Sequence, residues 1–439
     1  VAVNPSDERY KSLVNKNVIV PIVDRKIKII EDDYADPEQG TGAVKITPAH
    51  DFNDYEVGER NNLEIINVFT PDGKINENAP DNYIGLDRFE ARKRILKELS
   101  DKDLLVKEEK IKNKVPYGDR SNSIIEPYLT EQWFADAKKL SIKAKEIVNN
   151  KTTNFFPVNW TKTYFQWMDN IEPWCISRQL WWGHQIPAWY GPDGEIFVDE
   201  TEEGAKKLAK EHYKKDVELI RDPDVLDTWF SSGLWPFATL GWPEKNEYLE
   251  KFYPTSVLVT GFDIIFFWVA RMIMFGMEFQ NKEPFKNIYV HALVRDEKGQ
   301  KMSKSKGNVI DPLELIEKYS ADALRFTLLS MASPGRDVKL SEDRVKGYRN
   351  FLNKIWNANN FLIQNDCNFE NIETPNDLKL NINKWIFVEF TNTNEKIKKS
   401  IDSYRFDEAA RIAYQFVWHS FCDWYLELSK TVFYSENNE

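Results

Sequence analysis

The sequence predicts an α/β protein: a doubly wound parallel sheet, preceded by a mixed α/β region and followed by an α-helical bundle. Short β-like runs are frequent in residues 1–120. Apolar strand-like runs alternate with helical segments in residues 121–335, an order that favours parallel strands joined by helices. Helical periodicity fills residues 336–439. We expect these ranges to be the domains of the chain.

Composition limits the class of protein before any motif is considered. The 439 residues are too many for one compact domain, and 42% hydrophobic with 29% charged residues excludes collagen-like, disordered and coiled-coil chains. The net charge of −11 excludes a uniformly basic nucleic-acid-binding surface, although it allows a local basic strip. We therefore expect a soluble, globular protein.

Cysteine usage and hydropathy predict a cytoplasmic location. The three cysteines lie far apart and form no Cys-x-x-Cys pair, so we expect neither a disulfide framework nor a cysteine-rich zinc site. The most apolar run, residues 262–279, is about long enough to span a membrane. It contains Asp263, Arg271 and Glu278, however, and this density of charge predicts a buried core helix and no membrane partner.

Local signals predict the elements of the first two regions. The runs at 18–23 and 26–30 indicate short strands, and Asp51 has the position of an N-cap for a helix reaching about residue 61. A second helix is expected over 88–99. In the middle region, residues 257–260 predict a strand before the apolar helix, and residues 287–294 predict a strand that ends at a polar turn.

Helix signals dominate after that turn. Asp311 followed by Pro312 predicts a helix start, because the carboxylate can cap the helix and proline fits its first position. Later helical patterns cover 344–363, 383–400 and 406–432, with a linker at 374–377. These patterns predict the bundle.

The most specific motif is Lys301-Met302-Ser303-Lys304-Ser305, between the polar turn and the helix at 311. Chance occurrence of these five letters in a chain of this length is on the order of one in ten thousand. A solvated basic loop is the ordinary alternative for a run of lysines. We favour a loop whose ammonium groups contact a triphosphate, since lysine is a compact point charge on a flexible stem.

This element resembles the second signature of class I aminoacyl-tRNA synthetases, and the chain is similar to the valyl members of that family nearly from end to end. The resemblance is carried by Trp-Cys-Ile-Ser-Arg-Gln-Leu-Trp-Trp-Gly-His at 174–184, Asp-Val-Leu-Asp-Thr-Trp-Phe-Ser-Ser at 224–232 and Gly-Phe-Asp-Ile-Ile-Phe-Phe-Trp at 261–268. Isoleucyl members usually have a more polar stretch in place of 264–267, so isoleucine is the runner-up amino acid.

The resemblance implies an identity for each region. Residues 1–120, through the segments at 40–51 and 53–56, look like part of an editing domain. Residues 121–335 look like the second half of the catalytic nucleotide-binding domain, and residues 336–439 like the start of an anticodon-binding bundle. None of the five histidines forms the family's His-x-Gly-His element, and its threonine-rich editing strand is also missing. We therefore expect an internal fragment with an incomplete parallel sheet.

The function implied by the resemblance is that of a valine–tRNA ligase. Such an enzyme activates valine with ATP, transfers it to tRNA(Val) and hydrolyses mischarged threonyl-tRNA(Val). Mg²⁺ is expected to accompany ATP, with no protein-bound metal, and the protein is expected to be monomeric. The fragment alone is expected to be inactive. The alternatives are a module that binds tRNA or ATP without ligating them, the isoleucyl counterpart, and a stand-alone deacylase, which the missing threonine-rich strand disfavours.

Amino-acid activation needs no covalent nucleophile, so catalysis consists of positioning and stabilisation of charge on phosphate oxygens. By resemblance, Lys304, with Lys301 as its partner, would supply that stabilisation within the ATP-binding loop 301–305. Gly261 and Asp263 lie where a strand meets a helix and would contact the ribose of ATP. The alternative for Asp263 is that it only caps its helix.

Tryptophans carry the predicted amino-acid pocket. By resemblance, Trp229, Ile264 and Trp268 would form its walls, and ordinary core packing is the alternative. Ile264 and Trp268 are four residues apart and hence lie on one helical face. We expect Trp181 and Trp182 to lie in the core or to form a platform facing tRNA.

The predicted editing residues are Lys45, Asp51 and Asp54. By resemblance, Asp54 would hold the ammonium group of a mischarged amino acid, while Asp51 and Lys45 would help to select its hydroxyl group. The alternative is routine helix chemistry, with Asp51 as N-cap and Asp54 in the first turn. An editing site is needed because a hydrophobic pocket rejects an isosteric hydroxyl compound poorly.

Overall fold

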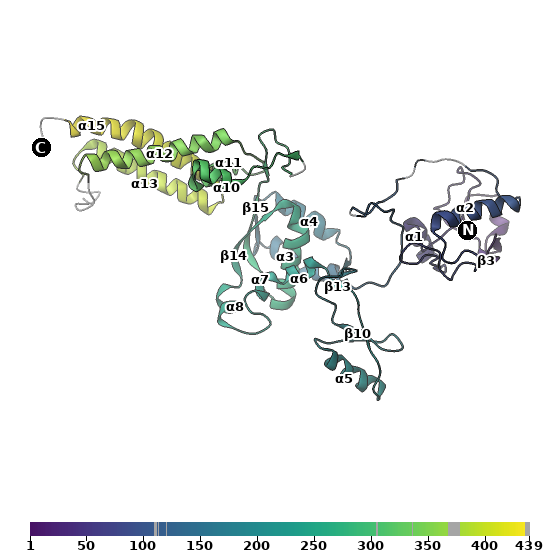
Figure 1. Ribbon diagram of the computed structural model, residues 1–439. Coiled ribbons are helices and arrows are strands. Elements are labelled where there is room, and N and C mark those ends of the chain that lie inside the picture. The colour runs from purple at the N-terminus through teal and green to yellow at the C-terminus, as the bar shows by residue number, and fades with distance from the viewer. Residues whose placement is uncertain are drawn as a thin grey trace. The chain divides into compact units, whose positions relative to one another are not determined.

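The computed structural model describes residues 1–108, 112, 114–119, 121–303, 306–335, 337–367 and 378–434. The chain forms two compact units, Val1–Gln132 and Trp133–Glu439 (Figure 1). None of the helices within the described ranges combines the length and apolar character needed to cross a membrane. The domain boundaries expected after residues 120 and 335 stay predictions.

The first unit is built on small strands. A sheet of order β4-β1-β5 has a parallel β1–β4 pair and an antiparallel β1–β5 pair, and β2 and β3 form the hairpin expected from the runs at 18–23 and 26–30. Ala2, Ile30 and Val57 pack together as its buried core. The strands and the short helix η1 are β1 (Ala2–Val3), η1 (Lys11–Leu13), β2 (Asn17–Val20), β3 (Arg25–Lys28), β4 (Ile30–Glu31) and β5 (Ala43–Val44).

Two helices complete this unit, and both predictions are confirmed. Helix α1 (Phe52–Arg60) begins after Asp51, whose side chain accepts hydrogen bonds from the backbone N–H groups of Asn53 and Asp54. Helix α2 (Arg88–Asp101) is capped in the same way by Asp87. Each cap satisfies donors that the first helical turn leaves unpaired.

The second unit contains the parallel sheet, with strand order β14-β15-β7. The strands are β14 (Thr255–Gly261), β15 (Phe285–His291) and β7 (Asn154–Phe156). Strand β15 ends three residues earlier than the pattern at 287–294 predicts. Val294 instead begins β16 (Val294–Arg295), which pairs with β17 (Val338–Lys339).

A helical crossover joins β14 to β15, and the buried core helix that the charged residues of run 262–279 predict is confirmed for its middle. Its middle, α9 (Arg271–Phe275), is fully buried. The run is not a plain α-helix: η2 (Phe262–Ile264) is a 3₁₀ turn, and both η3 (Ile265–Ala270) and η4 (Gly276–Gln280) are π-helical. π-Helical segments often occur at functional sites.

Helices cover one face of the sheet and leave part of the other open. Helices α3 (Ala137–Asn149), α4 (Trp160–Asp169) and α9 contribute to one core with Phe155 and Ile288 of the strands. Val257 and Val259 of β14, which is an edge strand among the described strands, are 38% and 60% exposed. Because parallel sheets are normally buried on both faces, this agrees with the expected incomplete sheet.

Smaller elements complete the second unit. Strands β9 and β13 form an antiparallel pair, and β10 pairs with both β11 and β12. These elements are β6 (Phe134–Ala135), β8 (Trp174–Cys175), β9 (Ser177–Arg178), β10 (Ala188–Tyr190), β11 (Ile196–Val198), α5 (Glu202–Tyr213), β12 (Ile220–Arg221), β13 (Val225–Leu226), α6 (Thr228–Gly233), α7 (Trp235–Ala238) and α8 (Glu247–Phe252).

The predicted C-terminal bundle is confirmed. Helix α13 packs on α14 and η7, and α12 also packs on η7. Figure 1 labels α12, α13 and α15 in this region. Helix α10 begins at Pro312, and the side chain of Asp311 accepts a hydrogen bond from the Leu313 N–H, as expected. The predicted linker 374–377 lies outside the described residues. The helices are α10 (Pro312–Tyr319), α11 (Ala321–Met331), α12 (Glu342–Gln364), α13 (Asn381–Asp402), α14 (Phe406–Gln415), η7 (Phe416–Leu426) and α15 (Glu427–Phe433).

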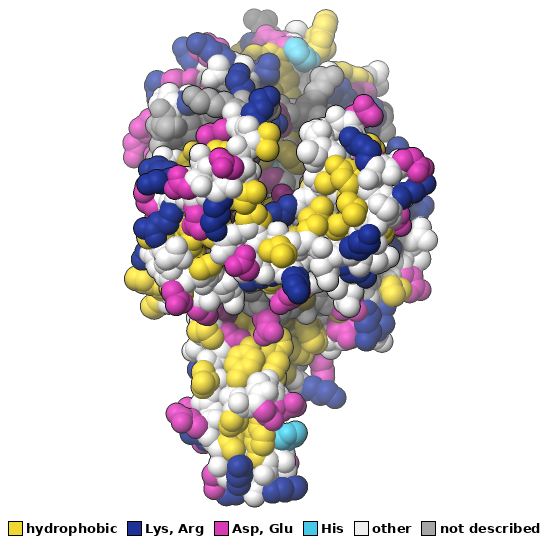
Figure 2. All heavy atoms as spheres, turned by 90° about the vertical axis from the view of Figure 1, so that its right-hand side faces the viewer, with side chains coloured by type: hydrophobic (Ala, Val, Ile, Leu, Met, Phe, Trp, Pro, Cys, Tyr) yellow, Lys and Arg dark blue, Asp and Glu magenta, His cyan; other side chains and the backbone are white. Residues whose placement is uncertain are grey.

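Basic and acidic side chains are mixed on one face of the molecule (Figure 2). On the face that Figure 2 shows, basic and acidic side chains of the described residues are interspersed. This face therefore carries no continuous basic strip among those residues.

Candidate active site

The carboxyl ends of β14 and β15 form one polar edge. Gly261 and His291 are paired in the last register position of these two strands. A Cβ atom added to Gly261 would lie 2.6 Å from Asp263 Oδ1 and 3.7 Å from His291 Cε1. Glycine is therefore needed at this position for the carboxylate to approach the strand end.

Asp263 is exposed at this edge. It lies in the first turn of η2, whose N-cap is Gly261, and η2 has no side-chain cap hydrogen bond from the described residues. The alternative in which Asp263 serves only as a helix cap is therefore wrong, and its carboxylate is available at the edge where nucleotides bind in open parallel sheets.

The three predicted pocket residues lie on elements in contact. Trp229 is on α6, which packs against η3, where Trp268 lies. The Trp268 indole N–H donates to the Ser232 carbonyl of α6 at 3.1 Å. Ile264 ends η2, directly before η3. All three predicted residues are half-buried, which leaves part of each side chain accessible.

Two of the recognised motifs meet through a strand pair. Ser177 and Arg178 of β9 pair with Leu226 and Val225 of β13, which brings the segment at 174–179 beside the segment at 224–232. Trp181 and Trp182, by contrast, are fully exposed, so the alternative that places them in the core is wrong.

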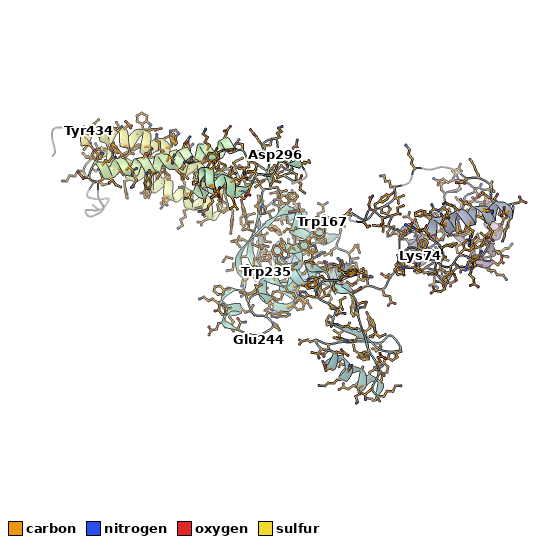
Figure 3. The ribbon with its side chains drawn as sticks, viewed as in Figure 1. Lys74, Trp167, Trp235, Glu244, Asp296 and Tyr434 are labelled. Carbon is orange, nitrogen blue, oxygen red and sulfur yellow. The ribbon has the colours of Figure 1, made fainter. Side chains whose placement is uncertain are left out.

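The lysine motif lies in a loop whose shape depends on Asn308. Its Nδ2 donates to Asp296 Oδ2 at 2.8 Å, and its Oδ1 accepts the backbone N–H of Ser303 at 3.0 Å. Asp296, labelled in Figure 3, belongs to the polar turn before the motif. Lys301 is exposed, whereas Met302 is half-buried. Lys304 and Ser305 lie outside the described residues.

Two of the predicted editing residues, Asp51 and Asp54, lie at the start of α1 in the first unit. Asp54 is buried, and its Oδ2 accepts the Thr47 N–H at 2.7 Å and the Thr47 hydroxyl at 2.9 Å. This leaves Asp54 Oδ1 without a hydrogen-bond partner among the described residues. Asp51 is exposed and caps α1, so its routine helix role is confirmed.

The charge of Asp54 acts on the ammonium group of Lys45. The residue is exposed, but its ammonium group lies in a crowded part of the unit, where desolvation lowers its pKa and the Asp54 charge opposes that effect. The neighbouring His50 accepts the Val68 N–H through Nε2 at 3.0 Å, and its buried Nδ1 has no partner in the described part of the chain. Burial lowers the His50 pKa.

Residues 53–341 match the family model for class I tRNA synthetases (I, L, M and V). This chain belongs to that family. Residues 6–88 also match the model for the leucyl-tRNA synthetase editing domain, and residues 383–439 match the anticodon-binding domain of tRNA ligases.

Curated relatives resemble this synthetase chain over its whole length. It is 78% identical over 439 residues to a valine–tRNA ligase of Pelagibacter ubique, covering 100% of this chain and 50% of the relative. It is 57% identical over 432 residues to a valine–tRNA ligase of Caulobacter vibrioides, covering 98% of this chain and 48% of the relative. The chain thus spans about half the length of these relatives.

A solved structure shares the fold of this class I chain. A Mycobacterium tuberculosis methionyl-tRNA synthetase in complex with methionyl-adenylate matches with a TM-score of 0.56 at 16% sequence identity. The match covers 87% of this chain and 71% of that structure.

Sequence patterns did not predict a functional role for Asn308, Thr47 or His291. Asn308 and Thr47 act through hydrogen bonds that only the folded loops create, and His291 could have been found only as the residue that ends β15. No group of three or more His, Cys, Asp or Glu suited to a metal ion occurs within the described ranges.

Proposed function

We propose that this chain is the part of a valine–tRNA ligase that carries the second half of its active-site fold. The observation that carries the proposal is the 78% identity to a valine–tRNA ligase along all 439 residues. That stretch contains Gly261 and Asp263 at the strand edge, the contacting elements α6 and η3 with Trp229 and Trp268, and the lysine loop. The whole protein would join valine to tRNA(Val) at the expense of ATP.

The first reaction is attack of a valine carboxylate oxygen on the α-phosphorus of ATP. One oxygen–phosphorus bond forms, the bond to pyrophosphate breaks, and valyl-adenylate results. Lys301 and Lys304 would neutralise charge on the phosphate oxygens, while Mg²⁺ arrives with the triphosphate as part of the substrate. Asp263 would accept hydrogen bonds from ribose hydroxyl groups beside Gly261.

The second reaction transfers valine to tRNA. A hydroxyl oxygen of the terminal adenosine attacks the carbonyl carbon of valyl-adenylate, AMP leaves, and the hydroxyl proton is released. Trp229, Ile264 and Trp268 would hold the isopropyl group through both steps, because indole rings and a branched aliphatic side chain exclude water. Such burial favours apolar substrates.

The other regions support accuracy and tRNA binding. We assign residues 1–120 to part of the editing domain, 121–335 to the second half of the catalytic domain and 336–439 to part of the anticodon-binding bundle. Asp54, with Asp51 and Lys45, would bind threonine on mischarged tRNA(Val). A monomeric protein in the cytoplasm fits this function.

Valine-dependent exchange of pyrophosphate into ATP tests the proposal. The assay compares the 439-residue chain with a completed polypeptide, in which these residues replace the matching half of the Pelagibacter ubique relative. We expect exchange only from the completed polypeptide, because the chain alone supplies an incomplete sheet. Exchange by the 439-residue chain alone would contradict the expectation that this chain is incomplete for catalysis.

The same assay separates the alternatives. A completed polypeptide that binds ATP or tRNA without exchange favours the binding-module alternative. Exchange with isoleucine in preference to valine favours the isoleucyl counterpart. Either result contradicts the proposed function.

A further inference from the structure

An ionic pair of buried residues links the start of α6, which carries Trp229, to the start of α9, which follows the Trp268 segment η3. Asp227 and Arg271 are 5% and 7% exposed, and Arg271 Nη1 lies 3.4 Å from Asp227 Oδ2. The same oxygen accepts the Trp174 indole N–H at 3.0 Å and lies 3.2 Å from Arg178 Nη2. Two arginines and one indole thus form a cluster around a single carboxylate.

The cluster fixes the start of α6. Asp227 is the N-cap of that helix, and its Oδ1 accepts the backbone N–H of Trp229 at 3.3 Å. Its own backbone N–H donates to the Ile176 carbonyl at 2.7 Å. The position of Trp229 therefore depends directly on the orientation of the Asp227 carboxylate.

The cluster also holds α6 against the helix that carries Trp268. Arg271 is the first residue of α9, which follows η3 directly. Gly233, the last residue of α6, lies so close to this helix that an added Cβ would meet Phe275 Cδ2 at 2.9 Å. The Arg271–Asp227 contact therefore joins the start of α6 to α9, and the Trp268–Ser232 hydrogen bond joins α6 to η3, the segment directly before α9.

The arginine is held by its plane as well as by its charge. Its guanidinium carbon lies 3.8 Å from the centroid of the Trp174 ring. A planar guanidinium can stack on an aromatic face while it donates to a carboxylate, whereas a lysine ammonium cannot reproduce both contacts. Burial lowers the Arg271 pKa to about 10, so the group stays charged at neutral pH.

We propose that Asp227 and Arg271 are positioning residues for amino-acid selection, which set the distance between the Trp229 and Trp268 walls of the pocket. The inference rests on the proposed function and extends it to two residues that do not touch the substrate. A pair buried at this depth costs desolvation and need not add net stability. Orienting Trp229 is a function that this buried ion pair can serve and that an apolar pair in its place would not supply.

The test is steady-state pyrophosphate exchange by the completed polypeptide with Arg271→Lys or Asp227→Asn. We expect the KM for valine to rise about tenfold with kcat within about twofold, because the pocket is misshapen while the phosphate-binding groups are unchanged. The preference for valine over isoleucine should fall by a similar factor. Arg325→Lys is the matched control, because its ion pair with Asp322 is exposed on both sides.

A milder variant keeps the inference testable if Arg271→Lys does not fold. Trp174→Phe removes the indole N–H donor to Asp227 but keeps a ring beneath Arg271. We expect a rise of about threefold in the KM for valine, with folding checked by circular dichroism. An unchanged KM and preference in every folded variant would overturn the inference, and so would equal losses for all substrates in kcat alone.

The outcomes distinguish the two proposals. If the unmodified completed polypeptide shows no valine-dependent exchange, the proposed function fails. If it is active and Trp229→Ala changes amino-acid preference while the cluster variants match Arg325→Lys, only the positioning inference fails.

Discussion

The Asn308 side chain links the polar turn at Asp296 to Ser303 inside the lysine motif: its Nδ2 donates to Asp296 Oδ2 at 2.8 Å, while its Oδ1 accepts the Ser303 N–H at 3.0 Å. Hydrogen bonding to Asn308 is also the largest influence that lowers the Asp296 pKa. One amide therefore fixes the turn before the motif and the backbone inside it.

Replacing Asn308 is expected to impair ATP binding. In the completed polypeptide, Asn308→Ala should raise the KM for ATP about tenfold, because the loop loses the hydrogen bonds that the Asn308 side chain makes with Asp296, Ser303 and Lys301. Asn308→Asp should be at least as damaging, since it places a second carboxylate against Asp296. The KM for valine should change little.

The control for this prediction is Asn170→Ala, which removes an exposed side-chain hydrogen bond to the Gln166 carbonyl at the end of α4. Pyrophosphate exchange at varied ATP concentration is the measurement. Equal KM values for ATP in the Asn308 and Asn170 variants would show that the loop does not need this amide.

Neutral substitutions at Lys301 and Lys304 test the phosphate role. The double alanine variant of the completed polypeptide should lose roughly a hundredfold or more in exchange rate, because charge on the triphosphate is no longer stabilised. Lys298→Ala, in the neighbouring turn, should retain activity. Full activity in the double variant would remove the lysine loop from the mechanism.

Gly261→Ala tests the close approach of Asp263 to the strand end. An added Cβ would lie 2.6 Å from the carboxylate oxygen, so the Asp263 carboxylate must move away from the strand end. We expect the KM for ATP to rise about tenfold. Gly347→Ala in α12 is the control, since nothing lies within 4 Å of its added Cβ. ATP titrations that match this control would count against the ribose-binding assignment.

Local chemistry made several elements predictable from the sequence. Asp51 and Asp311 cap their helices as expected because capping depends on the residue and its immediate neighbours. The predicted end of β15 was wrong because residues 292–294 are apolar, yet Val294 pairs with Val338, which is distant in the sequence. The π-helical segments were not predicted either, because tertiary packing can change the helical hydrogen-bond pattern without an obvious change in apolar spacing.

The candidate site also has features that the sequence predicts and features that it does not. Gly261 and Asp263 could be placed at a strand end because the strand and helix are consecutive. The Asp227–Arg271 contact could not be predicted, since it depends on the pairing of β9 with β13 and on the packing of α6 against α9. The bonds from Thr47 to Asp54 likewise form only when the loop before α1 folds back on that helix.

Asp54 and Thr47 allow the editing role to be separated from a structural one. In the completed polypeptide, Asp54→Asn should slow hydrolysis of threonyl-tRNA(Val) about tenfold, because an amide cannot pair with the amino acid's ammonium group. Thr47→Val removes only the hydroxyl bond to Asp54 and should retain most hydrolysis. The measurement is deacylation of preformed threonyl-tRNA(Val). Equal loss in both variants would assign Asp54 to stability alone.

Acid should destabilise the first unit through Asp32. Arg60 contacts both carboxylate oxygens of Asp32, at 2.7 and 2.8 Å, and the Asn61 side chain donates a further bond. Hydrogen bonding to Arg60 is the largest influence lowering the Asp32 pKa, from 3.8 to about 2. A carboxyl group whose pKa is lower in the folded state binds protons more readily when unfolded. Its stabilising contribution is therefore present above about pH 4 and is lost as pH falls towards 2.

The Asp32→Asn variant measures this contribution in the 439-residue chain. At pH 7 it should lower the free energy of unfolding of the first unit by about 1 kcal/mol, less than the full pKa shift implies because Arg60 is half exposed to solvent. The difference from the unmodified chain should shrink between about pH 4 and about pH 2 in urea titrations. Glu90→Gln, which breaks the exposed pair with Lys93, should have little effect. A difference that stays constant down to about pH 2 would mean that the amide substitution costs stability through packing or hydrogen-bond geometry, because a charge effect must vanish once the carboxylate is protonated in both states.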